Sequence, residues 1–414
     1  MSPWVAVATQ GLRRSKSMTW RRWGLKASPY TLNPIDETEL DLFVGRSNEI
    51  KHLQHSFSEN KCVVFLEGDR GVGKTAVGNY WRYDSMRKRL CFTPFVEIGV
   101  NPMESFYLFI TALIEAINWS LPQSVPFILR DPDFKKHESR SREFFDSVRT
   151  GVAAGGSLND VEDQYLYKEA KDLLENISHI SPKSGCEYGT IIQLSFATLN
   201  HSGGEKGLSE FRKKIWGVLA VHGFKWLLTG PSLLDAWLYH SDVQVQTKDM
   251  DKIAIQPLEL AQVYELLQRR KDYLGLNQNA KLPLALDVIE YLYSLSGGNL
   301  TRVFPLCETL AASQDRYQSM PELNLEVTKP LIVKHFKDES QKKWQLTPAA
   351  IEVLRFLVRD EGLPPSTIAD RMKRLRPNIS KILMHLKQKN LVRMEIRGRN
   401  RIYYPCMEAK IAFA

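Results

Sequence analysis

The residues of this chain whose types and spacing are best suited to chemistry form one short loop. Residues 68–75 read Gly-Asp-Arg-Gly-Val-Gly-Lys-Thr, which fits the pattern G-x-x-x-x-G-K-T. Glycines let the backbone curl until successive N–H groups point inward at an anion. The lysine can then reach nucleotide phosphates, and the threonine hydroxyl can join the ligands of Mg²⁺. The sequence therefore predicts a phosphate-binding loop made of Gly68, Asp69, Arg70, Gly71, Val72, Gly73, Lys74 and Thr75.

The flanking residues favour nucleotide binding over an ordinary glycine-rich turn. Residues 62–67 form an apolar run with the length and β-branched content of a buried strand. Residues 76–82 can continue as a helix, whose N-terminus adds a partial positive charge. We therefore expect ATP and Mg²⁺ as cofactors, with Lys74 as the catalytic lysine and Thr75 as a metal ligand.

The composition indicates a soluble protein of two or three domains. The chain has 414 residues, of which 43% are hydrophobic and 25% charged. No apolar stretch approaches the roughly 20 residues needed to span a bilayer, and the first basic residues follow the N-terminal apolar patch, the reverse of a secretory signal. Five scattered cysteines without a CxxC pair predict neither a disulfide framework nor a zinc site, which fits the cytoplasm. The net charge of +9 favours an anionic partner.

Strand-like and helix-like segments alternate after the loop. Strands are expected at residues 93–100, 190–196 and 224–230, and a helix at 105–119. This alternation predicts a parallel sheet covered on both faces. Residues 130–165 are polar with little periodicity, which predicts a flexible insertion.

The changes in character along the chain predict four parts. The first is a basic arm that packs on the first domain or stays mobile, the second is an α/β core, the third is helical, and the fourth is short and dense in arginine and lysine. Their predicted bounds are 1–40, 41–245, 246–340 and 341–414.

The second and third parts resemble AAA+ and STAND P-loop ATPases, in which a nucleotide lies between an α/β core and a helical lid. The resemblance rests on the loop at 68–75, on Phe43-Val44-Gly45-Arg46 before the first helix, and on Gly297-Gly298-Asn299-Leu300-Thr301-Arg302. The resemblance implies that Val44 and Arg46 lie against the adenine, that Thr229 senses the γ-phosphate at a strand end, and that Arg302 touches the phosphates when the lid closes. The alternatives are a turn-capping threonine and a plain surface arginine.

The chain departs from this family on one strand. Members carry an acid at its end, often followed by a second, to hold Mg²⁺ and orient water. The segment at 191–200 has Ala197 and Asn200 where these acids are expected. Alanine cannot ligate Mg²⁺, and an amide is a poor substitute for a carboxylate. Three acids nearby in the sequence could contribute instead, and no pattern selects one of them: Asp160, Asp163 and Glu187.

The last part has the element order of a DNA-binding domain. Thr347 can cap a helix, a short second helix follows near 365–372, and Pro377 starts a third. Two alternating strands around a turn at 397–400 then form a hairpin. This order resembles the winged helix-turn-helix, so the expected fold class is α/β, a P-loop parallel-sheet core with a helical lid and a small C-terminal winged-helix domain.

Charge agrees with a DNA-binding function for this domain. Residues 371–401 contain eleven lysines and arginines against a single acid, Glu395. In a winged helix the third helix enters the major groove and the wing follows the backbone or minor groove. Base contacts are expected from Asn378, Ser380, Lys381 and His385, and phosphate contacts from Arg374, Arg376, Arg397, Arg399 and Arg401. The alternative is a winged helix that binds protein.

These features together predict a cytoplasmic, ATP-binding protein whose nucleotide state controls binding to, or assembly on, double-stranded DNA. Core, lid and winged helix resemble origin-recognition initiator ATPases, whereas residues 23–30 resemble AAA+ ATPases of mobile elements. The alternative is a regulator or adaptor in transposition, defence or transcription that hardly turns ATP over. A homo-oligomer and a partner protein both stay open, and no membrane contact is expected.

Overall fold

The computed structural model separates into two compact units. Unit 1 comprises Met1–Leu32 and Pro257–Ala414, and unit 2 comprises Asn33–Gln256, so the chain passes between the units twice. The residues described are 20–101, 105–153, 160–180, 186–196, 205–231, 234, 238, 250–313, 323–360, 362–397 and 400–413. Within these ranges, no helix is both long enough and apolar enough to cross a membrane.

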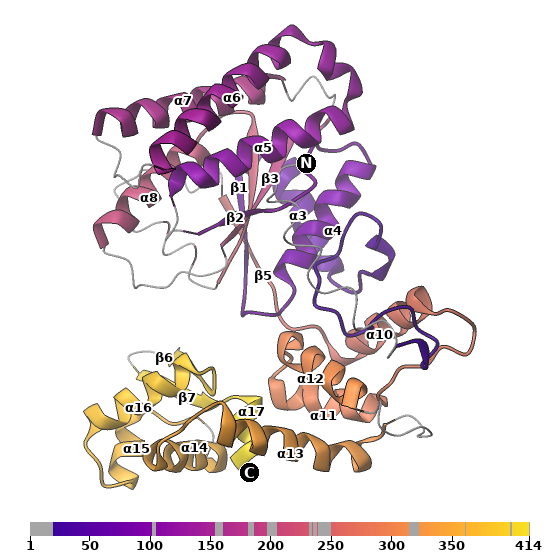
Figure 1. The fold of residues 1–414 in the computed structure, drawn as a ribbon, viewed down its shortest axis with the longest axis vertical. Coiled ribbons are helices and arrows are strands. Elements are labelled where there is room, and N and C mark those ends of the chain that lie inside the picture. Colours follow the sequence, from indigo (N-terminus) through magenta and orange to yellow (C-terminus); the bar gives the residue numbers. More distant parts are fainter. Residues whose placement is uncertain are drawn as a thin grey trace. The chain divides into compact units, whose positions relative to one another are not determined.

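Unit 2 is built on a five-stranded parallel sheet, as the sequence predicts (Figure 1). The strand order is β2-β3-β4-β1-β5. The strands are β1 (Val63–Glu67), β2 (Ile98–Val100), β3 (Thr190–Phe196), β4 (Phe224–Thr229) and β5 (Met250–Ala254). In register, Thr229 lies opposite Leu66 of β1 on one side and Ser195 of β3 on the other. Strands β4 and β5 therefore flank β1 at the point where it leaves the sheet.

Helices cover both faces of this sheet because alternate strand residues are apolar on each face. In β1, Val64 and Leu66 pack toward α3 and α4, while Val63 and Phe65 face the opposite core. The first face carries α3 (Ser47–Ser58) and α4 (Lys74–Arg87). The helices of the second core are α5 (Phe106–Ser124), α6 (Pro132–Ala153), α7 (Asp160–Ile180) and α8 (Glu205–Leu219). Two short 3₁₀ helices are η1 (Leu40–Leu42) and η2 (Pro126–Arg130).

The interval predicted to be a flexible insertion is largely helical, so that prediction is wrong for its described residues. Helix α6 spans most of it and packs against α7, as Figure 1 shows. A buried stripe runs along α6 at spacings of three and four residues: Phe134, His137, Ser141, Phe144 and Val148. The stripe was missed because two of its five positions are polar. Each of the two has a hydrogen-bonded atom: the Ser141 hydroxyl donates to the His137 carbonyl, and Nε2 of His137 lies 2.9 Å from Oδ1 of Asn118.

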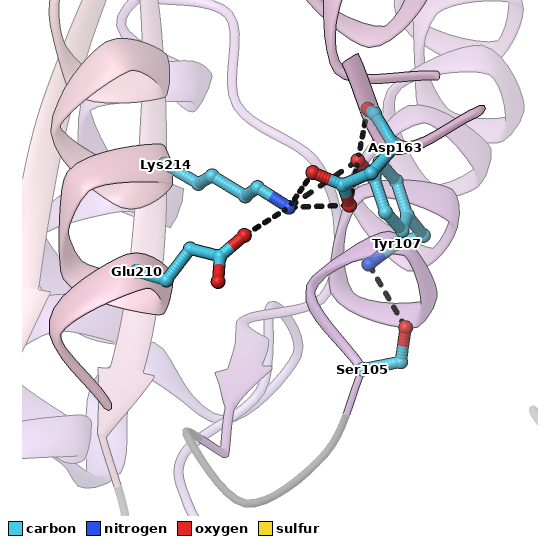
Figure 2. A network of polar contacts seen from close by, with 5 residues as sticks. All are labelled: Ser105, Tyr107, Asp163, Glu210 and Lys214. Carbon is cyan, nitrogen blue, oxygen red and sulfur yellow. Dashed lines mark hydrogen bonds and ion pairs between the residues drawn. The ribbon is translucent and has the colours of Figure 1, made fainter. Parts of the chain in front are cut away.

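A polar network ties three helices of this face together (Figure 2). The Lys214 ammonium of α8 lies 2.6 and 2.7 Å from the two carboxylate oxygens of Asp163 on α7. The Tyr107 hydroxyl of α5 donates to the same carboxylate at 2.8 Å. Ser105 caps α5 by accepting the N–H of Tyr107, and Glu210 lies 3.5 Å from the Lys214 ammonium. The Lys214 ammonium therefore balances the negative charge of the Asp163 carboxylate.

Unit 1 begins with four helices and a segment from the start of the chain. The helices are α10 (Leu260–Leu274), α11 (Leu286–Ser296), α12 (Leu300–Ser313) and α13 (Leu325–Lys342). Their core includes Trp20, Leu25 and Tyr30, all buried. Arg270 donates to the carbonyls of Pro29 and Thr31. Part of the segment predicted as an N-terminal arm is thus integral to the core of unit 1.

The rest of unit 1, here called the C-terminal module (residues 346–413), has the element order expected of a winged helix. It comprises α14 (Pro348–Asp360), α15 (Pro365–Arg371), α16 (Arg376–Gln388), β6 (Val392–Arg397), β7 (Asn400–Pro405) and α17 (Met407–Phe413). Strands β6 and β7 form the antiparallel hairpin, and Leu363 pairs with Tyr403 at its edge. The apolar stripe of α16, with Ile379 and Leu383, is buried in the core of the module. The predicted α/β fold with a small C-terminal domain is confirmed.

Candidate nucleotide and DNA sites

Residues 68–75, here called the glycine loop, connect β1 to α4, as the sequence predicts. Gly73 adopts φ of 95° as the N-cap of α4, a conformation that glycine takes at little cost. At Gly68 a side chain has no room, because an added Cβ would lie 2.3 Å from the carbonyl oxygen of Ile255. Among the remaining loop residues, Asp69 and Arg70 are exposed and Val72 is buried. The loop therefore passes directly into the N-terminus of a helix, where backbone N–H groups are available to an anion.

Lys74 lies over this loop. Its ammonium donates to the carbonyls of Gly68 and Asp69, each at 2.8 Å. Burial lowers the pKa of Lys74, and the nearby Asp69 carboxylate opposes that shift. Thr75 follows in the first turn of α4 and is partly exposed. The two residues predicted to contact phosphate and Mg²⁺ are thus consecutive in the first turn of α4, and both contacts stay predictions.

The side chain of Arg46 supports the glycine loop by binding its backbone. Its Nη2 donates to the carbonyls of Val72 at 2.9 Å and Gln256 at 2.5 Å, and its Nη1 pairs with Glu49 at 3.0 Å. Only 8% of the residue is exposed. The resemblance places this guanidinium at the adenine. In the structure its Nη2 instead donates to the backbone of the loop and of Gln256, the last residue of unit 2.

The segment before α3 lies along α4. Val44 is buried, with 4% of the residue exposed, and its contact with the adenine stays a prediction. Phe43 stacks on Tyr80 of α4, with ring centroids 4.0 Å apart and planes 9° from parallel. Asn79, also of α4, donates to the carbonyl of Ile35. Tyr80 was not predicted to take part, because its partner is 37 positions away and no local pattern signals the contact.

Thr229 occupies the strand end where the sequence places it. It is 2% exposed, and its hydroxyl donates to the carbonyl of Leu194 at 3.4 Å. Ligands of parallel α/β sheets bind outside the carboxyl ends of the strands. Thr229 lies at that edge, one strand away from the start of the glycine loop.

None of the acids considered as Mg²⁺ ligands is placed for that role in the described structure. Ala197 and Asn200 lie outside the described residues, as does the side chain of Asp160. Asp163 is bound by Lys214, and Glu187 precedes β3 at the amino end of the sheet, opposite to the glycine loop. Within the described ranges no group of three or more His, Cys, Asp or Glu residues could hold a metal ion. The Thr75 hydroxyl, phosphate oxygens and water are a donor set that Mg²⁺ accepts.

A buried arginine that the sequence analysis missed locks α4 to the sheet. Arg82 is fully buried, and its Nε donates to Oε1 of Gln193 on β3 at 2.7 Å. Gln193 in turn donates to Glu97 at 2.9 Å. Burial lowers the pKa of Arg82 and raises that of Glu97. This series of hydrogen bonds holds α4 against β3, and the N-terminus of α4 forms the end of the glycine loop.

Arg302 lies in unit 1, in the first turn of α12. Its Nη1 forms an ion pair with Glu408 of α17, and both terminal nitrogens face the carbonyl oxygen of Asn390 at 3.3–3.4 Å. The structure thus places this arginine against the C-terminal module. Its contact with nucleotide phosphates stays a prediction.

Three of the four residues predicted to contact base edges share one face of α16. Asn378, Lys381 and His385 are exposed there, at spacings of three and four residues, whereas Ser380 is half-buried and lies away from that face, because each residue turns the helix by about 100°. Arg376 and Arg401 are exposed, whereas Arg374 pairs with Glu352 at 2.8 Å and Arg397 with Glu395 at 3.2 Å. Arg399 lies outside the described residues. Among the described residues of this set, exposed cations therefore lie on α16 and on the hairpin.

Comparison with known proteins gives structural neighbours only. No family model matches the chain, and no curated protein matches it in sequence. The chain is similar to the Orc1 protein of Aeropyrum pernix, solved in complex with DNA, with a TM-score of 0.43 and 14% identity over 89% of this chain and 92% of that one. It is also similar to Cdc6p from Pyrobaculum aerophilum, with a TM-score of 0.38 and 12% identity over 92% and 96%. At these identities the likeness concerns the fold alone, so the function must follow from this chain's own residues.

Proposed function

We propose that this protein binds ATP with Mg²⁺ through the glycine loop and double-stranded DNA through the basic face of its C-terminal module. The nucleotide state then governs how the protein engages DNA or assembles on it. Lys74 contacts the phosphates, Thr75 supplies a protein ligand to Mg²⁺, and the base lies near the backbone at Val44. Bound Mg²⁺ neutralises phosphate charge, while the chain's own residues hold and orient the nucleotide.

The supporting observation is the glycine loop with its lysine. The loop leaves β1 at the carboxyl edge of a parallel sheet and ends in the N-terminus of α4. The ammonium of Lys74 lies 2.8 Å from two loop carbonyls, next to the backbone N–H groups that begin the helix. A partial positive helix end and a cation beside it favour a phosphate chain over a neutral ligand.

Titration with a fluorescent ATP analogue and Mg²⁺ tests the nucleotide half of the proposal. The Lys74→Ala variant should bind at least about tenfold more weakly, because a charge-assisted contact to phosphate is lost. Lys51→Ala, which removes an exposed lysine of α3, is the matched control and should bind like the wild type. Equal affinity of the wild type and Lys74→Ala would remove the loop from the proposal.

Anisotropy of a labelled duplex at several salt concentrations tests the DNA half. Affinity should fall steeply with salt, and Arg376→Ala or Arg401→Ala should each reduce the slope of log K against log salt by about one. Lys334→Ala removes an exposed cation of α13 outside the face and should leave the slope unchanged. A module that binds protein instead of DNA shows no salt-dependent duplex affinity.

A nucleotide-gated regulator with little turnover is the second candidate. It is favoured by Ala197 and Asn200 in place of the expected acids, and by the capture of Asp163 by Lys214. Steady-state ATP hydrolysis with and without duplex DNA distinguishes the two. Turnover that Lys74→Ala abolishes identifies an ATPase, whereas tight ATP retention without turnover identifies a regulator.

A further inference from the structure

Arg302 is fastened to the C-terminal module at two separate points. The first is Glu408 of α17, with which it forms an ion pair in which each side chain is 22% exposed. The second is the carbonyl oxygen of Asn390, which faces both terminal nitrogens of the guanidinium. A planar guanidinium suits this double contact, because its donors form a fixed fork.

Asn390 is the turn between the third helix and the wing. It follows α16 and precedes β6, and it adopts φ of 57°. Its neighbour Leu391 is buried in the core of the module. Because few residues accept this backbone conformation, a contact to the Asn390 carbonyl fixes the end of α16 and the start of the hairpin together.

Helix α17, which carries the other contact point, belongs to both cores of unit 1. Met407 and Ile411 pack in the core of α10–α13, whereas Ala409 packs in the core of the C-terminal module. Phe413 contacts both cores. Glu408 therefore stands on a helix whose displacement would disturb both, which makes it a firm anchor for Arg302.

We infer that Arg302 is a positioning residue for DNA binding, which holds α16 and the β6–β7 hairpin in a fixed orientation on α12 through Asn390 and Glu408. The inference rests on the proposed DNA-binding function. It assigns to Arg302 a task that needs no nucleotide, in contrast to the contact with phosphates that the sequence resemblance implies.

The Glu408→Gln variant distinguishes a positioning role of Arg302 from a general effect of charge, because the two predict opposite changes in duplex DNA affinity. Removal of an acid from a DNA-binding unit strengthens attraction to phosphates. Loss of the Arg302 anchor has the opposite effect, and we expect duplex affinity without nucleotide to fall about three- to tenfold. Glu326→Gln removes an exposed acid of α13 and is the matched control, with affinity unchanged or slightly raised.

A charge exchange gives the second measurement. Arg302→Glu and Glu408→Arg should each weaken duplex binding, and the double variant should recover part of it because the ion pair is re-formed with opposite polarity. Recovery is only partial because a carboxylate at position 302 cannot donate to the Asn390 carbonyl. ATP affinity is measured on the same proteins. If Arg302 acts on phosphates alone, Arg302→Ala weakens ATP binding, while Glu408→Gln changes neither ligand's affinity.

The outcomes separate this inference from the function on which it rests. Glu408→Gln protein that binds duplex DNA as tightly as the wild type, or more tightly, overturns the positioning role and leaves DNA binding in place. A wild-type protein without affinity for duplex DNA overturns the DNA function itself. Should Glu408→Gln fail to fold, the charge-exchanged double variant decides, since a folded double variant as weak as the single variants also contradicts the inference.

Discussion

The backbone of Arg46 has a conformation that residues other than glycine rarely adopt. Its φ is 67°, which costs on the order of 1–3 kcal/mol and persists only where the surroundings impose it. Here the guanidinium imposes it, through the carbonyls of Val72 and Gln256. The strain is thus located between the glycine loop and the point where the chain leaves unit 2.

Replacement of Arg46 by glycine tests this arrangement. Arg46→Gly relieves the backbone strain but removes the brace, so ATP affinity should fall about three- to tenfold because the loop is less well ordered before binding. The measurement is the fluorescent-nucleotide titration. Arg89→Gly is the matched control, since Arg89 has φ of 57° and an exposed side chain just beyond the C-terminal end of α4. If the Arg89→Gly variant also binds ATP more weakly than the wild type, the role is not specific to Arg46.

The glycine loop could be predicted because its chemistry is local, whereas the brace could not. Lys74 and Thr75 follow three glycines within one short pattern that dictates both conformation and ligand. The contact from Arg46 to Gln256 spans 210 positions, and it exists only after β5 has paired with β1. Sequence periodicity carries no information about which carbonyl will face a given guanidinium.

His137 makes the stability of unit 2 depend on pH. Its Nε2 lies 2.9 Å from Oδ1 of Asn118, while Nδ1 is buried with no hydrogen-bond partner among the described residues. A second proton on the ring would therefore have no acceptor. Burial, and then the nearby Arg140, lower the pKa of His137 from 6.5 to about 4.

The free energy of unfolding should fall as the pH drops from about 6.5 to about 4. In that window the unfolded chain takes up a proton on His137 that the folded chain does not, at a cost reaching about 3 kcal/mol. His137→Gln keeps a donor toward Asn118 without titrating, so urea unfolding at several pH values should show a shallower decline. His222→Gln, at an exposed histidine of the same unit, should keep the wild-type slope.

At the scale of elements, the sequence predicted those whose apolar pattern is continuous. Strands β1, β3 and β4 and the helices of the C-terminal module were found because each carries an unbroken apolar run or stripe. Helix α6 was missed because His137 and Ser141 interrupt its buried stripe. Polar residues can replace apolar ones on a buried face only where they find partners, and those partners lie on other elements or on the folded helix itself.

The network of Lys214, Asp163 and Tyr107 should stabilise the packing of α8, α7 and α5. Lys214→Met keeps the length of the side chain but leaves the Asp163 carboxylate, 24% exposed, without its cation. We expect the free energy of unfolding to fall by about 1–3 kcal/mol. Urea unfolding measures it, with Lys213→Met as the exposed control. In the double variant Lys214→Met/Asp163→Asn the loss should be smaller than the sum of the two single losses.

At the scale of the whole molecule, the two units have separate cores and separate proposed ligands. The glycine loop lies in unit 2 and the basic face of the C-terminal module in unit 1. A ligand stabilises only the part of a protein that binds it in the folded state. Thermal unfolding should therefore show two transitions, and ATP with Mg²⁺ should raise the one that belongs to unit 2.

The size of that shift follows from mass action. At about 100 times its dissociation constant, ATP adds about 2.7 kcal/mol, which for a unit of this size raises the midpoint by about 5–10 °C. Hydrogen exchange assigns each calorimetric transition to its residues, and Lys74→Ala should abolish the shift while leaving both transitions in place. Duplex DNA should raise the other transition, by less at higher salt. An ATP shift that survives Lys74→Ala, or one confined to unit 1, would contradict nucleotide binding at the glycine loop.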